Sequence, residues 1–92
     1  MKVMTTWALK PGALREAVGR FLRGEANPHE GVKLLGRWHA TDLSMGFSLY
    51  ELDDPAQLHL HAAPWAELLE LKNTLVIEDD QAGPNLAKVY GS

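Results

Sequence analysis

Two neighbouring segments of this chain carry apolar residues on both faces of a strand. They lie within residues 31–52, GVKLLGRWHATDLSMGFSLYEL, and predict strands at about Val32–Thr41 and Met45–Leu52. A half-buried strand needs only one apolar face, so these strands indicate a sheet that is covered on both sides. The rest of the chain supplies amphipathic helices for only one face. We therefore expect a second copy of the chain to cover the other.

Length and composition narrow the class of protein. With 92 residues, the chain is expected to form a single domain, residues 1–92, around one core. It has no cysteine, which excludes disulfides and thiolate metal ligands. The start, MKVMTTWALK, has no apolar run long enough for a signal peptide or a membrane span, so we expect a cytoplasmic protein that does not bind membranes. A net charge of −3, with scattered Lys and Arg, argues against nucleic acid as a partner.

In the N-terminal third of the chain, the spacing of the apolar residues changes once, from that of a strand to that of a helix. A strand is predicted at Lys2–Leu9 and ends at Pro11. From Ala13 the apolar residues recur at intervals of three and four, which predicts a helix that ends near Gly24. The stripe of that helix consists of Leu14, Ala17, Val18, Phe21 and Leu22.

A second helix is predicted to begin after the two central strands. Asp54 can cap it, and Pro55 suits its first position. Pro64 removes a backbone donor and crowds the preceding turn, so we expect a kink or two shorter helices. The last strand is predicted at about Leu71–Glu78, and a short helix or tail at Asn85–Tyr90.

The predicted order is βαββαβ, which is the ferredoxin-like α+β arrangement: a four-stranded antiparallel sheet with both helices on one face. The uncharged phase of the second strand is expected to face the helices; it consists of Val32, Leu34, Gly36, Trp38 and Ala40. The opposite phase consists of Lys33, Leu35, Arg37, His39 and Thr41. If Met4, Tyr50 and Leu52 share this second face with Leu35, the apolar patch is larger than monomers usually expose, which favours a homodimer.

Several short motifs together resemble a known family. They are the run EGVKLLGRWHATD, the Gly46-Phe47 pair, the Asp53-Asp54-Pro55 helix start, the Trp-x-x-Leu-Leu step at residues 65–69, and Trp7. In combination they are similar to a family of short bacterial domains of unknown function in the dimeric α+β-barrel superfamily, over nearly the whole chain. The resemblance implies a ferredoxin-like protomer whose sheet pairs with that of a second protomer. Members of the wider superfamily are small oxygenases, isomerases, haem-handling proteins or ligand binders, so the resemblance assigns no activity.

Aromatic residues are the candidates for the walls of a ligand pocket. Trp7 and Trp38 lie on predicted strands and Trp65 on a predicted helix, so they can surround one apolar cavity between sheet and helices. The alternative is that they only fill a small core. His61 lies on the apolar stripe of its helix and can point into the same cavity.

His39 and Arg37 are the candidates for catalysis, because they lie two residues apart on one face of a predicted strand. His39 suits a general base at neutral pH, and Arg37 can hold a carboxylate or an oxyanion through two hydrogen bonds. The alternatives are an interface histidine and a salt bridge between subunits. Tyr50 shares this face if the register is right, and either donates a proton or packs.

No cofactor or metal site is expected. His59 and His61 would form a ligand pair on a strand, but in a helix a separation of two points them to different sides. No phosphate-binding glycine loop and no Gly-x-Ser-x-Gly motif is present.

Two kinds of function fit these features best. One is a homodimer that binds a small apolar or aromatic ligand between Trp7, Trp38 and Trp65, with His39 as a polar contact. The other is a cofactor-independent enzyme of monooxygenase or isomerase type, in which His39 acts as base and Arg37 stabilises negative charge. A purely structural module that binds a partner is the third alternative.

Overall fold

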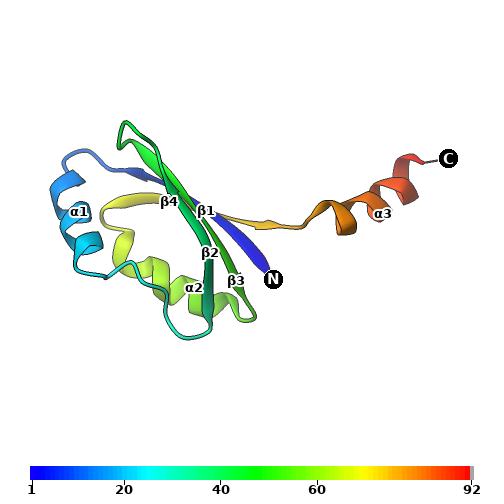
Figure 1. Ribbon diagram of the computed structural model, residues 1–92, viewed down its shortest axis with the longest axis horizontal. Helices are drawn as coiled ribbons and strands as arrows, with labels where there is room; N and C mark the ends of the chain where they lie inside the picture. Colours follow the sequence, from blue (N-terminus) through cyan, green and yellow to red (C-terminus); the bar gives the residue numbers. More distant parts are fainter. Residues whose placement is uncertain (92) are drawn as a thin grey trace.

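The strands and helices follow each other in the predicted βαββαβ order, with a third helix at the end (Figure 1). The computed structural model describes residues 1–91. Its elements are β1 (Lys2–Leu9), α1 (Leu14–Leu22), β2 (Val32–His39), β3 (Met45–Leu52), α2 (Pro55–Ala62), the single 3-10 turn η1 (Ala63–Trp65), β4 (Leu69–Val76) and α3 (Asp79–Tyr90). The sheet has the order β2-β3-β1-β4 with antiparallel neighbours, and α1 and α2 lie on one side of it. This confirms the predicted ferredoxin-like α+β fold. Within the described residues, no helix is long and apolar enough to cross a membrane.

The start and the end of α2 follow from two local features of the sequence. The Asp54 side chain accepts a hydrogen bond of 2.9 Å from the backbone N–H of Ala56, and Pro55 occupies the first helical position, both as predicted. The α-helix ends at Ala62, and Pro64 lies in the following 3-10 turn. The predicted interruption of this helix is therefore confirmed.

A β-bulge in β2 exchanges the two faces of that strand halfway along it. Leu34 pairs with Tyr50, but Gly36 pairs with Leu49, so Leu35 is an extra residue in the ladder. Before the bulge the predicted faces are correct, and Val32 is buried towards the helices. After the bulge they are wrong. Arg37 and His39 then lie on the inner face of the sheet, opposite Ser48 and Gly46 of β3, and Trp38 lies on the outer face.

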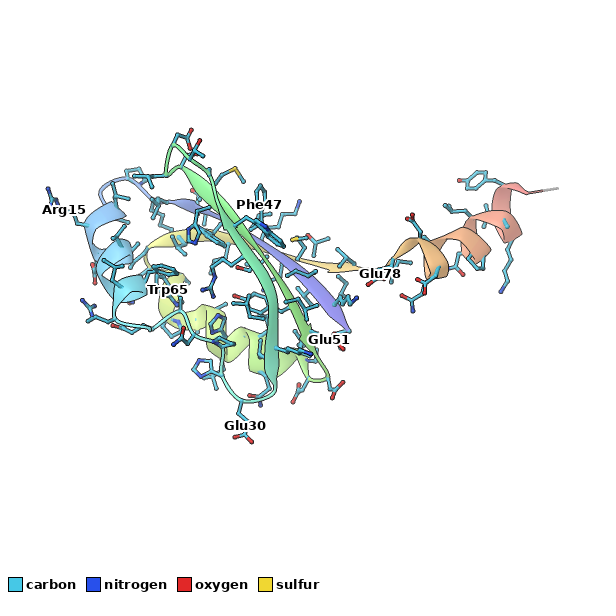
Figure 2. All side chains as sticks on the ribbon, viewed as in Figure 1. Arg15, Glu30, Phe47, Glu51, Trp65 and Glu78 are labelled. Carbon is cyan, nitrogen blue, oxygen red and sulfur yellow. The ribbon has the colours of Figure 1, made fainter. Side chains whose placement is uncertain are left out.

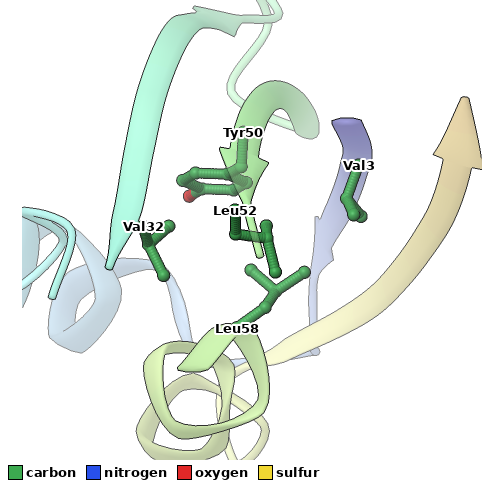
Figure 3. Close-up of a cluster of buried hydrophobic side chains, with 5 residues drawn as sticks. All are labelled: Val3, Val32, Tyr50, Leu52 and Leu58. Atoms are coloured by element: carbon green, nitrogen blue, oxygen red, sulfur yellow. The ribbon is translucent and has the colours of Figure 1, made fainter. Parts of the chain in front are cut away.

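Tyr50 and Leu52 also lie on the inner face rather than on the outer one. Both side chains are almost completely buried, with 4% and 3% exposed. They form a core cluster with Val3, Val32 and Leu58, in which Leu58 of α2 packs beneath the sheet (Figure 3). The hypothesis that Tyr50 and Leu52 contribute to an exposed patch is therefore wrong.

A second core cluster lies at the other end of the inner face. It consists of Ala13, Ala17, Trp65, Leu68 and Leu69, with Trp7, Leu9, Ala26 and Leu71 packed against it. The helix α1 and its N-cap residue thus pack through two small side chains, Ala17 and Ala13, against the segment that follows α2. Its larger apolar side chains are left free to line the space between the two clusters.

The outer face of the sheet still carries apolar side chains. Trp38 and Phe47 are paired neighbours on β2 and β3 and are 54% and 40% exposed. Leu35, at the bulge, is 38% exposed. Figure 2 shows Phe47 on the side of the sheet that faces away from the helices, whereas Trp65 lies on the helix side.

The helix α3 projects away from the rest of the chain (Figure 1). It begins six residues earlier than predicted, at Asp79, and contains Pro84 in its interior. None of its residues in the described range is buried. The molecule consequently has a long axis of 54 Å.

Candidate functional site

A cavity of about 410 Å³ lies between the inner face of the sheet and the helices α1 and α2. Its lining is mainly apolar and includes Tyr50 and Leu58 from one core cluster, Trp65 and Leu69 from the other, and Trp7, which packs against the second cluster. The cavity therefore occupies the gap between the two parts of the core.

One wall of the cavity is the apolar stripe of α1. Leu14, Val18 and Phe21 line the cavity, yet they remain 41%, 42% and 39% exposed. In a filled core of this fold, such side chains would be covered by the sheet. Here they border a space that solvent or a ligand can enter.

The floor of the cavity depends on a close contact between Trp7 and Gly46. These residues are paired neighbours on β1 and β3, and the indole of Trp7 lies across Gly46. A Cβ atom at position 46 would overlap the ring, so only glycine permits this arrangement. The large aromatic surface of Trp7 is thereby laid along the sheet, where it lines the cavity.

Arg37 brings a positive charge to this apolar space. One Nη2 N–H donates to the backbone carbonyl of Ala26 at 2.7 Å, and Nε donates to the Ser48 hydroxyl at 3.4 Å. The guanidinium carbon lies 5.7 Å from the centre of the Phe21 ring, within the range of a cation–π contact. Arg37 is thus held by the loop after α1, by β3 and by α1 itself.

His39 lies at the more open end of the cavity. Its ring makes edge contacts with Trp7 and Phe21, with centroid distances of 5.6 and 5.3 Å. No hydrogen bond fixes the His39 ring within residues 1–91, so both ring nitrogens can reach a bound molecule or water.

Tyr50 and His61 form a buried polar pair inside the cavity. The Tyr50 hydroxyl lies 3.2 Å from His61 Nε2, and the two rings are 5.5 Å apart. His61 is only 7% exposed, and its Nδ1 atom has no hydrogen-bond partner in the described part of the chain. Buried polar atoms are rarely left in this way, so Nδ1 is a position where a ligand can complete a hydrogen bond.

The environment of His61 favours its neutral form. Burial lowers the pKa of His61 below its ordinary value of 6.5, and the nearby positive charges of His29 and Arg37 lower it further. The neutral ring has one donor and one acceptor nitrogen, so His61 contributes polarity to the cavity without adding charge at neutral pH.

Six of the seven predicted site residues surround this cavity: Trp7, Arg37, His39, Tyr50, His61 and Trp65. Trp38 does not. The bulge turns its side chain to the outer face, where the indole covers Gly36. Arg37 and His39 share the cavity with the tryptophans for the same reason, whereas the uninterrupted alternation of the sequence placed them on the opposite face.

Two contributors to the site were not identified from the sequence. Phe21 appeared only as part of the helical stripe, although it contacts both His39 and Arg37. Ser48 lies opposite Arg37 and accepts its Nε hydrogen bond. Phe21 is recognised as a site residue because the apolar stripe of α1 stays partly exposed beside the cavity, and this exposure is seen only in the structure.

His59 and His61 of α2 lie two residues apart and therefore point to different sides of the helix, as expected. His59 is exposed and His61 is buried. In the range 1–91, no group of three His, Asp or Glu side chains is arranged to hold a metal ion.

The chain is thus a ferredoxin-like α+β protein with an apolar cavity between its sheet and helices. Comparison with protein-family models matches residues 1–90 to the family described as "Domain of unknown function (DUF3303)". Because the match covers almost the entire chain, the protein belongs to this family. No curated protein matches the sequence.

The lowered pKa of His61 predicts an acid-sensitive fold. In the unfolded chain His61 titrates near 6.5, whereas in the folded chain its pKa is lower. Below pH 6.5 the unfolded state therefore binds more protons than the folded state. As the pH is lowered from 6.5 to the folded-state pKa, the free energy of unfolding decreases by at most about 1.4 kcal/mol per pH unit. Urea unfolding across this range should show a smaller loss for His61→Gln than for the wild type.

The exposed His59 on the same helix provides the control. His59→Gln should keep the full pH dependence of the wild type, because its side chain is solvated in both states. Equal pH dependence in the wild type and His61→Gln would contradict the assignment of the acid sensitivity to His61.

Proposed function

We propose that this protein binds a small apolar or aromatic molecule in the cavity between the sheet and helices α1 and α2. The observation that carries this proposal is a mainly apolar space of about 410 Å³ into which only a few polar side chains project. Small-molecule sites in proteins have this composition and a volume in this range. The apolar body of the ligand contacts Trp7, Trp65 and Phe21, while Arg37, His39 and the Tyr50–His61 pair orient it.

A neutral apolar dye tests this proposal directly. N-phenylnaphthylamine should bind with an increase in fluorescence, and Phe21→Ala should weaken its binding about tenfold, because the ligand then loses contact with an aromatic ring of the cavity wall. Titration of the dye at constant protein concentration gives the dissociation constants. Phe21 is suited to the test because it is 39% exposed and its removal leaves both core clusters intact.

Leu60→Ala is the matched control, because Leu60 is 55% exposed and lies outside the cavity lining. It should leave dye binding unchanged. Equal binding to both variants, or no binding to the wild type, contradicts the cavity as the ligand site.

A second candidate function rests on the placement of His39 and Arg37 in the same cavity. Both line it from one strand, two residues apart, with the His39 ring held only by aromatic edges. An enzyme of the isomerase or cofactor-independent monooxygenase type would use His39 to take a proton from a bound substrate and Arg37 to stabilise the resulting anion.

The molecule retained during purification distinguishes catalysis from simple binding. Native mass spectrometry of the wild type and of His39→Gln should give one and the same ligand mass if the protein only binds. If His39 performs proton transfer, the variant should retain the unconverted substrate, and the two ligands should differ in mass or in chromatographic retention. His59→Gln serves as the control, since it lies away from the cavity.

We also propose that the protein is a homodimer whose outer sheet faces pack against each other as a dimeric α+β barrel. The outer face exposes Trp38, Phe47 and Leu35, which together form an apolar patch on β2 and β3. Large apolar patches of this kind usually mark a contact surface. A second copy is the most economical partner, because it presents an identical surface under a two-fold axis.

The helix α3 supports the same proposal. Isolated helices of this length are marginal in water, and the interior Gly83 and Pro84 disfavour α3 further, by about 1 and about 3 kcal/mol relative to alanine. Its apolar side chains Leu86, Val89 and Tyr90 are 57%, 72% and 81% exposed. A helix with these properties needs a contact from outside the protomer, and a second copy of the chain supplies one.

Val89→Asp tests the contribution of α3 to the dimer. Sedimentation velocity at micromolar concentration should give twice the mass of the chain for the wild type and a larger monomer fraction for Val89→Asp. Ala87→Asp introduces the same charge in the same turn but points to about the opposite side of the helix, so it should remain dimeric. A wild type that sediments only as a monomer would rule out the homodimer.

A further inference from the structure

We infer that the ligand of the cavity is an aromatic monoanion whose carboxylate, or a planar group of equivalent charge, pairs with Arg37. This inference rests on the proposed ligand-binding function and names the chemical class that the site selects. It follows from the charge balance of the cavity, the free donors of Arg37 and the open hydrogen-bond position on His61.

The positive charge of Arg37 has no acidic partner in the described part of the chain. The ion pairs of residues 1–91 join Lys2 to Glu78, Arg20 to Glu16, and Arg23 to Glu25. The partners of Arg37 are instead a backbone carbonyl and a hydroxyl, both uncharged. The lining around Arg37 is mainly apolar, so an anion that enters the cavity has this guanidinium as its charged partner.

The geometry of Arg37 leaves room for such an anion. A guanidinium carries five N–H donors, and Arg37 uses one on Nη2 and the one on Nε. Both donors of Nη1 and the second donor of Nη2 have no acceptor within residues 1–91. Adjacent donors on the two Nη atoms match the two oxygens of a carboxylate, which is the arrangement of a bidentate pair.

Arg37 is the only lysine or arginine among the described residues that line the cavity, which favours a ligand with a single negative charge. His61 favours its neutral form, because burial, followed by His29 and Arg37, lowers its pKa. Its free Nδ1 atom therefore provides one uncharged hydrogen bond rather than a second positive charge. A dianion such as a phosphate monoester would find only one permanently charged side chain, Arg37, in the described lining.

The apolar lining supports an aromatic body for this anion. Phe21 lies against both Arg37 and His39, and Trp7 lies against His39, so a planar ring that enters beside the guanidinium meets aromatic surfaces. Trp65 lines the same cavity from the helix side (Figure 2). Ring contacts of this kind favour aromatic over aliphatic acids of the same size.

Paired probes that differ only in charge test the inference. Naphthoate and naphthamide have nearly the same shape, but only naphthoate is charged at neutral pH. Isothermal titration of the wild type should show naphthoate binding at least about tenfold more tightly, since hydrogen bonds to charged groups are stronger. Arg37→Gln should reduce this preference to about onefold, whereas Arg15→Gln, which removes the same charge from an exposed site, should leave it unchanged.

Arg37→Lys keeps the test decisive if Arg37→Gln does not fold. It retains the charge but lacks the planar pair of donors, so it should lower the preference for naphthoate several-fold. Equal affinity of the wild type for both probes overturns the anion assignment and leaves the proposed ligand binding intact. Failure of the wild type to bind either probe, when it also fails to bind N-phenylnaphthylamine, overturns both. A loss of dimerisation in Arg37→Gln without loss of the naphthoate preference would show that Arg37 pairs with a carboxylate of the second copy, which also overturns the inference.

Discussion

The extra residue in β2 determines which chemistry the inner face of this protein can offer. Because Leu35 is inserted between the pairs Leu34–Tyr50 and Gly36–Leu49, the faces of the strand are exchanged from Gly36 onward. Without the bulge, Arg37 and His39 would lie on the outer face and Trp38 would fill the space beneath the helices. With it, the inner face carries a cation and a histidine in place of a third indole, and both share the cavity with the buried Tyr50–His61 pair. Bulges commonly redirect side chains at functional sites in this way.

The size of the cavity is a consequence of how α1 is held. Ala13 and Ala17 pack against Trp65 and the residues that follow it, and Arg20 donates a hydrogen bond of 2.9 Å to the carbonyl of Pro64. These contacts fix α1 to the segment after α2 rather than to the centre of the sheet. Pro64 is therefore important for the site as well as for the end of α2, because the chain leaves the helix there and presents a free carbonyl to α1. The apolar stripe of α1 then faces a gap that its own side chains do not fill.

The elements of the fold could be predicted from periodicity, because each period reports a local backbone geometry. The strands Lys2–Leu9 and Met45–Leu52 have the predicted bounds, and Asp54, Pro55 and Pro64 act as expected. The last strand is Leu69–Val76 rather than Leu71–Glu78, because the chain becomes extended soon after η1 and Leu68 and Leu69 join the core. The bulge was missed because alternation assumes an unbroken register. Gly36 within an apolar strand was the available signal, since an isolated glycine in a strand often marks a bulge.

Two adjacent residues of β2 place their side chains on opposite faces of the sheet. Arg37 faces the cavity and Trp38 faces outward, and both are held by the hydrogen-bonded ladder between β2 and β3. If the proposed ligand displaces the guanidinium and the backbone that carries Trp38, its binding would share free energy with the proposed dimer contact. Thermodynamic linkage would then require the two equilibria to change each other by the same factor. The indole of Trp38 lies over Gly36, the first residue after the bulge, so such coupling would pass through this segment of β2.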